Sequence, residues 1–126
     1  MFTPTIKLEH SDGRGEIYSI ELPDGHELML LHSTPGAWRG GHSHDCNEIV
    51  VLLSGEMDYW KRVSDRDVIH SLEAGEASYN TAGQIHMGHF KADSWVVEYK
   101  LAKKGKWAQT DFEPYRRAVR DSFKNN

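Results

Sequence analysis

Apolar and polar residues alternate along most of the chain in short segments, without long helical stretches. Segments rich in β-branched and aromatic residues are separated by turns that contain glycine, proline, asparagine or aspartate, as is typical of antiparallel strands. The pattern predicts eight strands, at residues 16–21, 27–32, 48–53, 56–61, 68–72, 76–80, 86–91 and 95–101. Many short strands at this spacing indicate a sandwich or a closed barrel.

The last part of the chain has a different period. Tyr115, Val119 and Phe123 recur at helical spacing, and Pro114 suits the first turn of a helix. We therefore expect a helix at about residues 111–124 on the outside of the strands. It has too few apolar residues to form a core of its own.

Length and composition favour one domain. The 126 residues suffice for a single hydrophobic core, so residues 1–126 are expected to form one domain with its barrel at about 15–102. The chain is 38% hydrophobic and 27% charged, and its net charge of -4 offers no basic surface for nucleic acid. No apolar run approaches the length of a membrane span, and the N-terminus lacks the pattern of a signal peptide. We expect a cytoplasmic protein whose partner is a small molecule.

The single cysteine, Cys46, fits this compartment because one cysteine forms no disulfide within the chain. A lone cysteine is commonly a small buried residue. Cys46 lies between His44 and Glu48, which are candidate metal ligands discussed below, so a redox-sensitive thiol is also allowed. We assign Cys46 no role.

Candidate chemistry concentrates in His42, His44 and Glu48, just before an apolar strand. Alternation along a strand points His42 and His44 to the same side, and a short turn is expected to bring Glu48 back from the neighbouring strand. Two neutral imidazoles and a carboxylate suit iron, manganese, nickel, cobalt or zinc, whereas calcium prefers more oxygen ligands. This cluster alone is moderately specific, because the chain contains eight histidines.

Other histidines are interpreted as incidental. Four lie near turns or in polar settings: His10, His26, His32 and His70. His89 lies three residues after His86, so strand alternation should turn it to the opposite face, away from any ligand position.

Glycines at fixed spacings make the pattern far more specific. One part of the chain resembles the first signature of the cupin family at every fixed position. It is the run Gly36-x5-His42-x-His44-x3-Glu48-x6-Gly55. The second signature resembles Gly75-x5-Thr81-Ala82-Gly83-x2-His86. Cupins usually have proline at the position of Thr81 and asparagine at the position of Phe90, and neither departure touches a ligand position.

The resemblance to cupins implies an all-β jelly-roll barrel in which His42, His44, Glu48 and His86 hold one divalent transition metal near one mouth. The turn at Gly83 is expected to bring His86 into the barrel opposite the first three ligands. Open coordination positions would take water or substrate. The resemblance also implies a homodimer, formed by packing sheets or by exchanging an N-terminal strand within residues 1–22.

The first functional hypothesis is a metal-dependent enzyme of dioxygenase, isomerase or lyase type that acts on a small oxygenated substrate. Alternation predicts inward-facing positions that include Tyr59 on one strand and Trp95, Val97 and Tyr99 on the last strand. Of these, Tyr59 and Tyr99 have polar tips that could reach a ligand. The candidate catalytic residues are His42, His44, Tyr59, Tyr99 and Arg39.

Two alternatives stay open. Asp12-Gly13-Arg14-Gly15 and Arg39-Gly40-Gly41-His42-Ser43-His44 resemble segments of nucleotide-sugar ketoisomerases and epimerases of jelly-roll fold, which generally need no metal. That resemblance implies proton transfer by His42 and His44, with Arg39 or Arg14 near a diphosphate. The other alternative is a cupin that only binds a small molecule.

Overall fold

The computed structural model describes residues 1–124, with side chains described for residues 1–122, and contains eleven strands and one helix in that range. The strands are β1 (Thr5–Asp12), β2 (Gly15–Glu21), β3 (Glu27–Ser33), β4 (Trp38–His44), β5 (Glu48–Ser54), β6 (Glu56–Val63), β7 (Arg66–Glu73), β8 (Ala77–Asn80), β9 (His86–Phe90), β10 (Ser94–Lys100) and β11 (Gln109–Asp111). The helix is α1 (Glu113–Lys124).

All eight predicted strands and the helix are present, and the sequence pattern missed β1, β4 and β11. The strand β4 was missed because Gly40 and Gly41 interrupt it, and glycine has low strand propensity. The strand β1 is exposed along seven of its eight residues, so it carries no alternation of buried and exposed positions.

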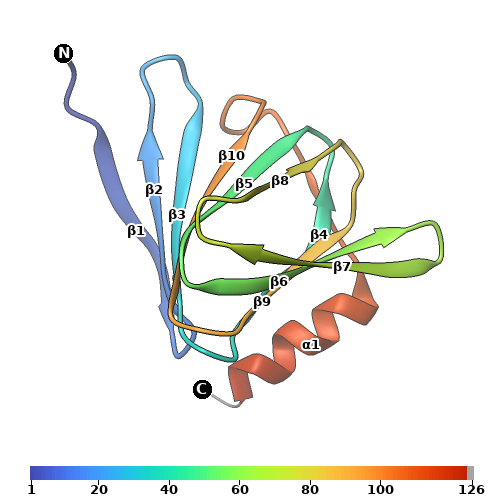
Figure 1. Ribbon diagram of the computed structural model, residues 1–126. Coiled ribbons are helices and arrows are strands. Elements are labelled where there is room, and N and C mark those ends of the chain that lie inside the picture. The colour runs from blue at the N-terminus through green and yellow to red at the C-terminus, as the bar shows by residue number, and fades with distance from the viewer. Residues whose placement is uncertain (125–126) are drawn as a thin grey trace.

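The strands form two antiparallel sheets that face each other, as Figure 1 shows. One sheet has the order β1-β2-β3-β10-β5-β8 and the other has the order β11-β4-β9-β6-β7. From β3 onward the chain crosses between the sheets at every connection except that from β6 to β7, which is a hairpin within one sheet. The described backbone pairings thus give a two-sheet jelly roll, with α1 packed outside the five-stranded sheet.

The hydrophobic core fills the space between the sheets. Along β5, Val50 and Leu52 are fully buried whereas Leu53 is 51% exposed, which is the alternation expected of a strand with one face on a core. Burying each such side chain contributes about 1.5–3 kcal/mol. The other buried core residues are Leu31, Ala37, Met57, Tyr59, Phe90 and Val96.

Helix α1 covers the outer face of the five-stranded sheet. Tyr115 and Val119 are buried there against Met87 of β9, which confirms the helical spacing read from the sequence. The side chain of Phe123 lies outside the described residues. The Tyr115 hydroxyl also donates to Asp67 Oδ1 at 2.6 Å, so the helix is attached to β7 as well as packed on β9.

One strand has the opposite facing to that predicted. On β10, Val96 is buried in the core and Glu98 lines the interior, so Trp95, Val97 and Tyr99 face outward. The prediction was wrong because it placed the aromatic row inside and the charged residue outside, following ordinary burial preferences. The interior at this strand is polar, which no hydrophobic pattern could reveal.

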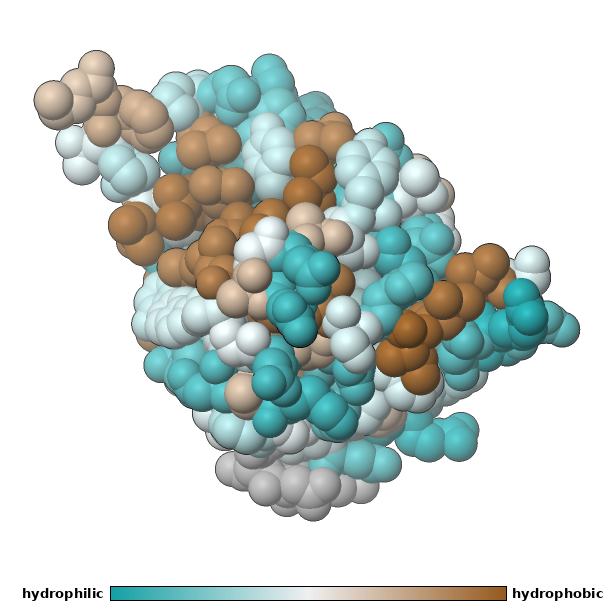
Figure 2. Space-filling view, viewed as in Figure 1, coloured by the Kyte–Doolittle hydropathy of each residue, from teal (hydrophilic) through white to brown (hydrophobic). Residues whose placement is uncertain are grey.

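Apolar side chains also gather on the surface, over β1 and its neighbours and along the β6–β7 hairpin (Figure 2). The exposed members include Ile6 and Leu8 on β1 and Val63 and Ile69 on the hairpin. Within the described part of the chain, no helix combines the length and the hydropathy that crossing a bilayer requires.

A histidine outside the signatures links three segments of the first sheet. The two ring nitrogens of His32 lie 2.8 Å from Glu16 Oε2 and 2.7 Å from Asp93 Oδ1, and its ring stacks on Trp95 at 4.8 Å. The bond to Glu16, followed by that to Asp93, raises the pKa of His32 above its usual value of 6.5. This residue is therefore a structural link and not an incidental surface histidine.

Gly41 is predicted to be the position of β4 least tolerant of a side chain. Its φ is +85°, and an added Cβ would lie 3.0 Å from Arg116 Cδ and 3.1 Å from Arg116 N on α1. Gly75→Ala is the matched control, because Gly75 has a φ of +91° but open space around it. In urea denaturation we expect Gly75→Ala to cost roughly 1–2 kcal/mol and Gly41→Ala roughly 2–5 kcal/mol. Equal losses of unfolding free energy in the two variants would contradict the close contact between Gly41 and helix α1.

The His32 link predicts a pH-dependent stability. A folded-state pKa above the unfolded value means that the link stabilises fully below about pH 6.5 and is lost as pH rises through the raised pKa. The midpoint of urea unfolding should therefore exceed that of His32→Gln by more at pH 6 than at pH 9. A constant difference across this range would show that the protonated imidazole contributes nothing.

Candidate metal centre

Three imidazoles meet between the sheets because β4 and β9 pair side by side. The register places His42 directly across from His86, and His44 lies two residues further along β4. One possible ligand atom of each imidazole lies within 4.8 Å of the others. His44 and His86 are only 5% and 3% exposed, so the cluster is an interior feature.

Glu48 approaches the imidazoles from the facing sheet. It begins β5, is fully buried, and places Oε1 3.4 Å from His86 Nε2 and 3.8 Å from His44 Nδ1. The sequence pattern predicted the positions of Glu48 and His86 relative to His42 the wrong way round. It expected Glu48 on the strand neighbouring His42 and expected His86 from the opposite side, whereas His86 is the cross-strand neighbour and Glu48 crosses the interior.

Further side chains hold these groups in place. Asn80 Nδ2 donates to Glu48 Oε1 at 3.1 Å and to the Tyr59 hydroxyl at 2.7 Å. His86 Nδ1 lies 3.0 Å from the Gln84 carbonyl oxygen. Because a carbonyl only accepts, this bond places the proton on Nδ1 and leaves the Nε2 lone pair facing the cluster.

Lys100 adds a cation that the sequence did not reveal. Its Nζ lies 3.3 Å from Glu48 Oε2 and 4.5 Å from the centre of the Trp107 ring, which also packs against His44. Sequence reasoning missed Lys100 because it depends on the cross-strand register of β5 and β10, which places Lys100 opposite Glu48. The carboxylate therefore interacts with both an ammonium group and the imidazoles.

Burial keeps the rings of His42 and His44 neutral. Burial, followed by the neighbouring His86 and His44, lowers the pKa of His42 to about 2. Burial, followed by Lys100, lowers the pKa of His44 to about 4. Both rings are therefore unprotonated near neutral pH, as a metal ligand must be.

The cluster fits a metal ion. Buried polar atoms almost always have hydrogen-bond partners, yet His42 Nδ1, His44 Nδ1 and His86 Nε2 have none among the described residues. A cation would satisfy such unpaired nitrogens. Three imidazoles with an adjacent carboxylate are a donor set for a divalent transition metal.

The remaining catalytic candidates are placed differently from one another. Tyr59 is buried with its ring 6.0 Å from that of His86, and burial raises the pKa of its hydroxyl, which stays protonated. Arg39 is buried and lines the interior beside the cluster. Tyr99 lies on the outer face with its ring 5.6 Å from that of His26, so the structure does not bring it to the site.

Two further residues lie outside the cluster. The His89 ring stacks on Trp38 at 3.8 Å on the outer side of β9, as its expected facing predicts. Cys46 is partly buried in the turn between β4 and β5, and burial raises the pKa of its thiol. A raised pKa leaves little reactive thiolate near neutral pH.

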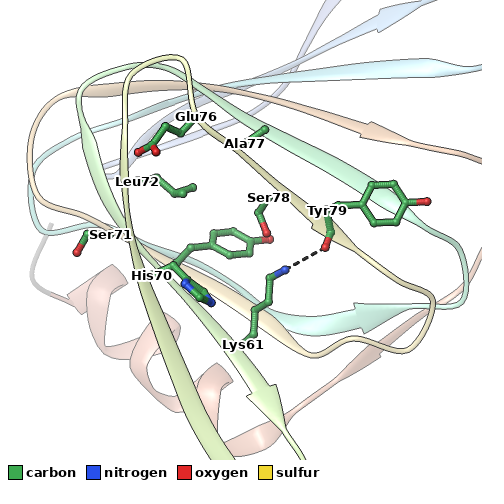
Figure 3. A pocket seen from close by; sticks show the side chains of 9 residues that line it. Lys61, His70, Ser71, Leu72, Glu76, Ala77, Ser78 and Tyr79 are labelled. Atoms are coloured by element: carbon green, nitrogen blue, oxygen red, sulfur yellow. Dashed lines mark hydrogen bonds between the residues drawn. The ribbon is translucent and has the colours of Figure 1, made fainter.

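Two cavities near the metal centre differ in which site residues line them. A cleft of about 330 Å³ between β8 and the β6–β7 hairpin contains Lys61, whose Nζ donates to the Tyr79 carbonyl oxygen at 2.9 Å (Figure 3). Of the site residues, only Tyr59 lines this cleft. A second cavity of about 180 Å³ is lined by His42 and therefore borders the imidazole cluster.

No family model and no curated protein matches the sequence. Solved structures do match in fold. The capsular polysaccharide assembling protein CapF from Staphylococcus aureus superimposes with a TM-score of 0.67 and 20% identity, over 81% of this chain and 30% of that chain. Oxalate decarboxylase from Bacillus subtilis gives 0.61 and 17% identity, over 84% and 30% respectively.

A globulin extends the comparison beyond these two. The 7S globulin of Momordica charantia superimposes with a TM-score of 0.70 and 13% identity, over 84% of this chain and 35% of that chain. This chain thus spans about a third of the length of each of the three structures. At these identities the likeness concerns the fold alone. The predicted fold is confirmed, and the chain is a jelly roll with the cupin fold.

Proposed function

We propose that this protein is a metal-dependent enzyme that acts on a small oxygen-bearing substrate. His42, His44 and His86, with Glu48, would hold one divalent transition metal. The observation that carries the proposal is a group of three clustered imidazoles, each with a buried ring nitrogen that has no hydrogen-bond partner among the described residues. The donor set suits iron, manganese, nickel, cobalt and zinc alike. Such an ion, when bound, activates a coordinated oxygen or supports oxidation.

The surrounding residues would prepare the site for that chemistry. The Gln84 carbonyl fixes the tautomer of His86, and Asn80 orients Glu48 and Tyr59 together. Tyr59 accepts from Asn80, so its hydroxyl proton remains to donate to a substrate oxygen. Positioned groups of this kind raise rates by holding reactants in register.

The comparisons support a small substrate and leave the reaction class broad. Oxalate decarboxylase and oxalate oxidase, which share the fold, are enzymes named for a small dicarboxylate. We accordingly propose dioxygenase, isomerase or lyase chemistry at the ion, and the fold does not choose among them.

A metal-free nucleotide-sugar isomerase is the second candidate, because Arg14, Arg39 and His42 line one cavity. Two observations weigh against it. A general base works best with a pKa near the working pH, and the pKa of His42 is lowered to about 2. The cavity of about 180 Å³ is also below the roughly 300–1,000 Å³ of sites for larger ligands.

One experiment tests the proposed function directly. Metal content would be measured on protein purified without a His tag, followed by oxygen consumption and product analysis with small hydroxy, keto and thiol compounds. We expect near-stoichiometric metal and turnover that is lost on chelation. Turnover that survives chelation would support the isomerase instead, and stoichiometric metal without turnover would indicate a binding protein.

His86→Ala should abolish metal-dependent stabilisation. With free Co²⁺ at 100 times its Kd, the wild-type protein should gain about 2.7 kcal/mol of unfolding free energy. His70→Ala is the matched control, because His70 is exposed on β7 and outside the cluster. The measurement is thermal unfolding with and without Co²⁺, after circular dichroism shows that both variants fold. An equal gain in His86→Ala would rule out the cluster as the metal site.

Lys100→Gln should tighten metal binding. Its ammonium lies 3.3 Å from Glu48 Oε2, where it attracts the carboxylate and repels an incoming cation. We expect a several-fold lower Kd for Co²⁺ by calorimetric titration, with the exposed Lys103→Gln unchanged. Weaker binding in Lys100→Gln would instead show that the ammonium positions Glu48 for the metal.

A further inference from the structure

The cavity beside His42 is unusually rich in arginine. It has a volume of about 180 Å³ and is bordered by both sheets and by α1. Three arginines line it, Arg14, Arg39 and Arg116, together with the single acidic residue Glu98. Such a lining predicts a negatively charged occupant.

Arg39 is the residue whose interactions are incomplete. It is 7% exposed, and its guanidinium donates to the Ser33 hydroxyl at 2.7 Å, to the His32 carbonyl at 3.0 Å and to the Arg14 carbonyl at 3.4 Å. All three acceptors are neutral. Among the described side chains, no carboxylate lies within ion-pair distance of Arg39 and no acceptor meets its Nη1.

The carboxylates of Asp12, Glu98 and Glu16 attract the Arg39 guanidinium from a distance, but none of them forms an ion pair with it. A buried cation without a paired carboxylate is costly, so this arrangement needs an explanation. Arg14 differs, because Asp12 Oδ2 lies 2.9 Å from its Nη2. Burial, and then the neighbouring Arg14, lowers the pKa of Arg39 to about 10, so its guanidinium remains charged near neutral pH. A free anion would supply the missing counter-charge.

Arg116 adds to the positive charge of the cavity. It donates to the Gly40 carbonyl at 2.7 Å and has no carboxylate partner among the described residues. The lining also includes the apolar residues Ile17 and Leu31. The cavity thus combines cationic and apolar residues, and its size admits a molecule of few heavy atoms.

We propose that this cavity binds the carboxylate group of a small organic acid, with the Arg39 guanidinium as its anchor. The planar guanidinium matches a carboxylate in shape and charge. Ile17 and Leu31 would contact the short carbon chain of the acid. Because His42 lines the same cavity, the bound acid would be presented to the metal centre, and in this respect the inference rests on the proposed function.

The test uses lactate as the probe and lactamide as its uncharged counterpart of similar shape. Binding is followed in chelator-treated protein by calorimetry and by the side-chain Nε–H resonance of Arg39 in ¹H–¹⁵N NMR spectra. We expect lactate to bind with a Kd on the order of millimolar and to shift the Arg39 resonance. Lactamide should bind at least tenfold more weakly.

Variants locate the binding on Arg39. Arg39→Gln should weaken lactate binding at least tenfold, and Arg39→Lys should restore part of it, because lysine keeps the charge without the planar fork. Arg117→Gln is the control, since it makes the same charge change on the exposed side of α1. If Arg39→Gln does not fold, the wild-type Arg39 resonance still decides the question.

The outcomes separate this inference from the proposed function. An Arg39 resonance that lactate leaves unmoved, or equal binding of lactate and lactamide, would overturn the carboxylate site. Phosphate that binds as tightly as lactate would also overturn it, as a general anion site. Lactate binding in a protein that takes up no Co²⁺ would leave the cavity assignment standing while the metal-dependent function fails.

Discussion

The structure depends on one constraint, which is that a cluster of polar groups is buried between two sheets. His42, His44, His86 and Glu48 lie in an interior where unpaired polar atoms are costly. Asn80 and Lys100 satisfy part of the Glu48 carboxylate, but three imidazole nitrogens have no hydrogen-bond partner among the described residues. The neutral rings of His42 and His44 are well suited to hold a cation and poorly suited to carry a proton. The cluster therefore leaves buried polar atoms without hydrogen bonds, which does not stabilise the fold. Its arrangement is instead suited to binding a metal ion.

The topology explains why residues far apart in sequence meet. The pairing of β4 with β9 places His42 beside His86, and the crossing from β4 to β5 carries Glu48 to the facing sheet. Helix α1 then packs behind β4, where Gly41 allows the close approach. Arg116 of that helix reaches the cavity beside His42, so the outer layer contributes directly to the surroundings of the site.

Much of this arrangement could be predicted from the sequence. The alternation of short segments predicted the strands, and the spaced glycines predicted turns, since Gly36, Gly55, Gly75 and Gly83 all have positive φ. Cross-strand registers were not predictable, so Lys100 and Asn80 were missed. The facing of β10 was predicted wrongly because its inward row contains Glu98, and a buried charged residue contradicts the ordinary pattern that such predictions use. The errors in side-chain facing and in the site residues thus fall where the interior is polar, whereas the strands that were missed lie outside the predicted alternation.

The central claim is that three imidazoles and one carboxylate converge on a single ion. X-ray absorption spectroscopy of the cobalt-loaded protein measures this directly, because imidazole rings and carboxylate oxygens scatter differently. We expect one cobalt per chain with three imidazole ligands and oxygen donors that include Glu48, and a loss of one imidazole in His44→Ala. Cobalt coordinated by fewer than two imidazoles, or with a spectrum unchanged by His44→Ala, would contradict it.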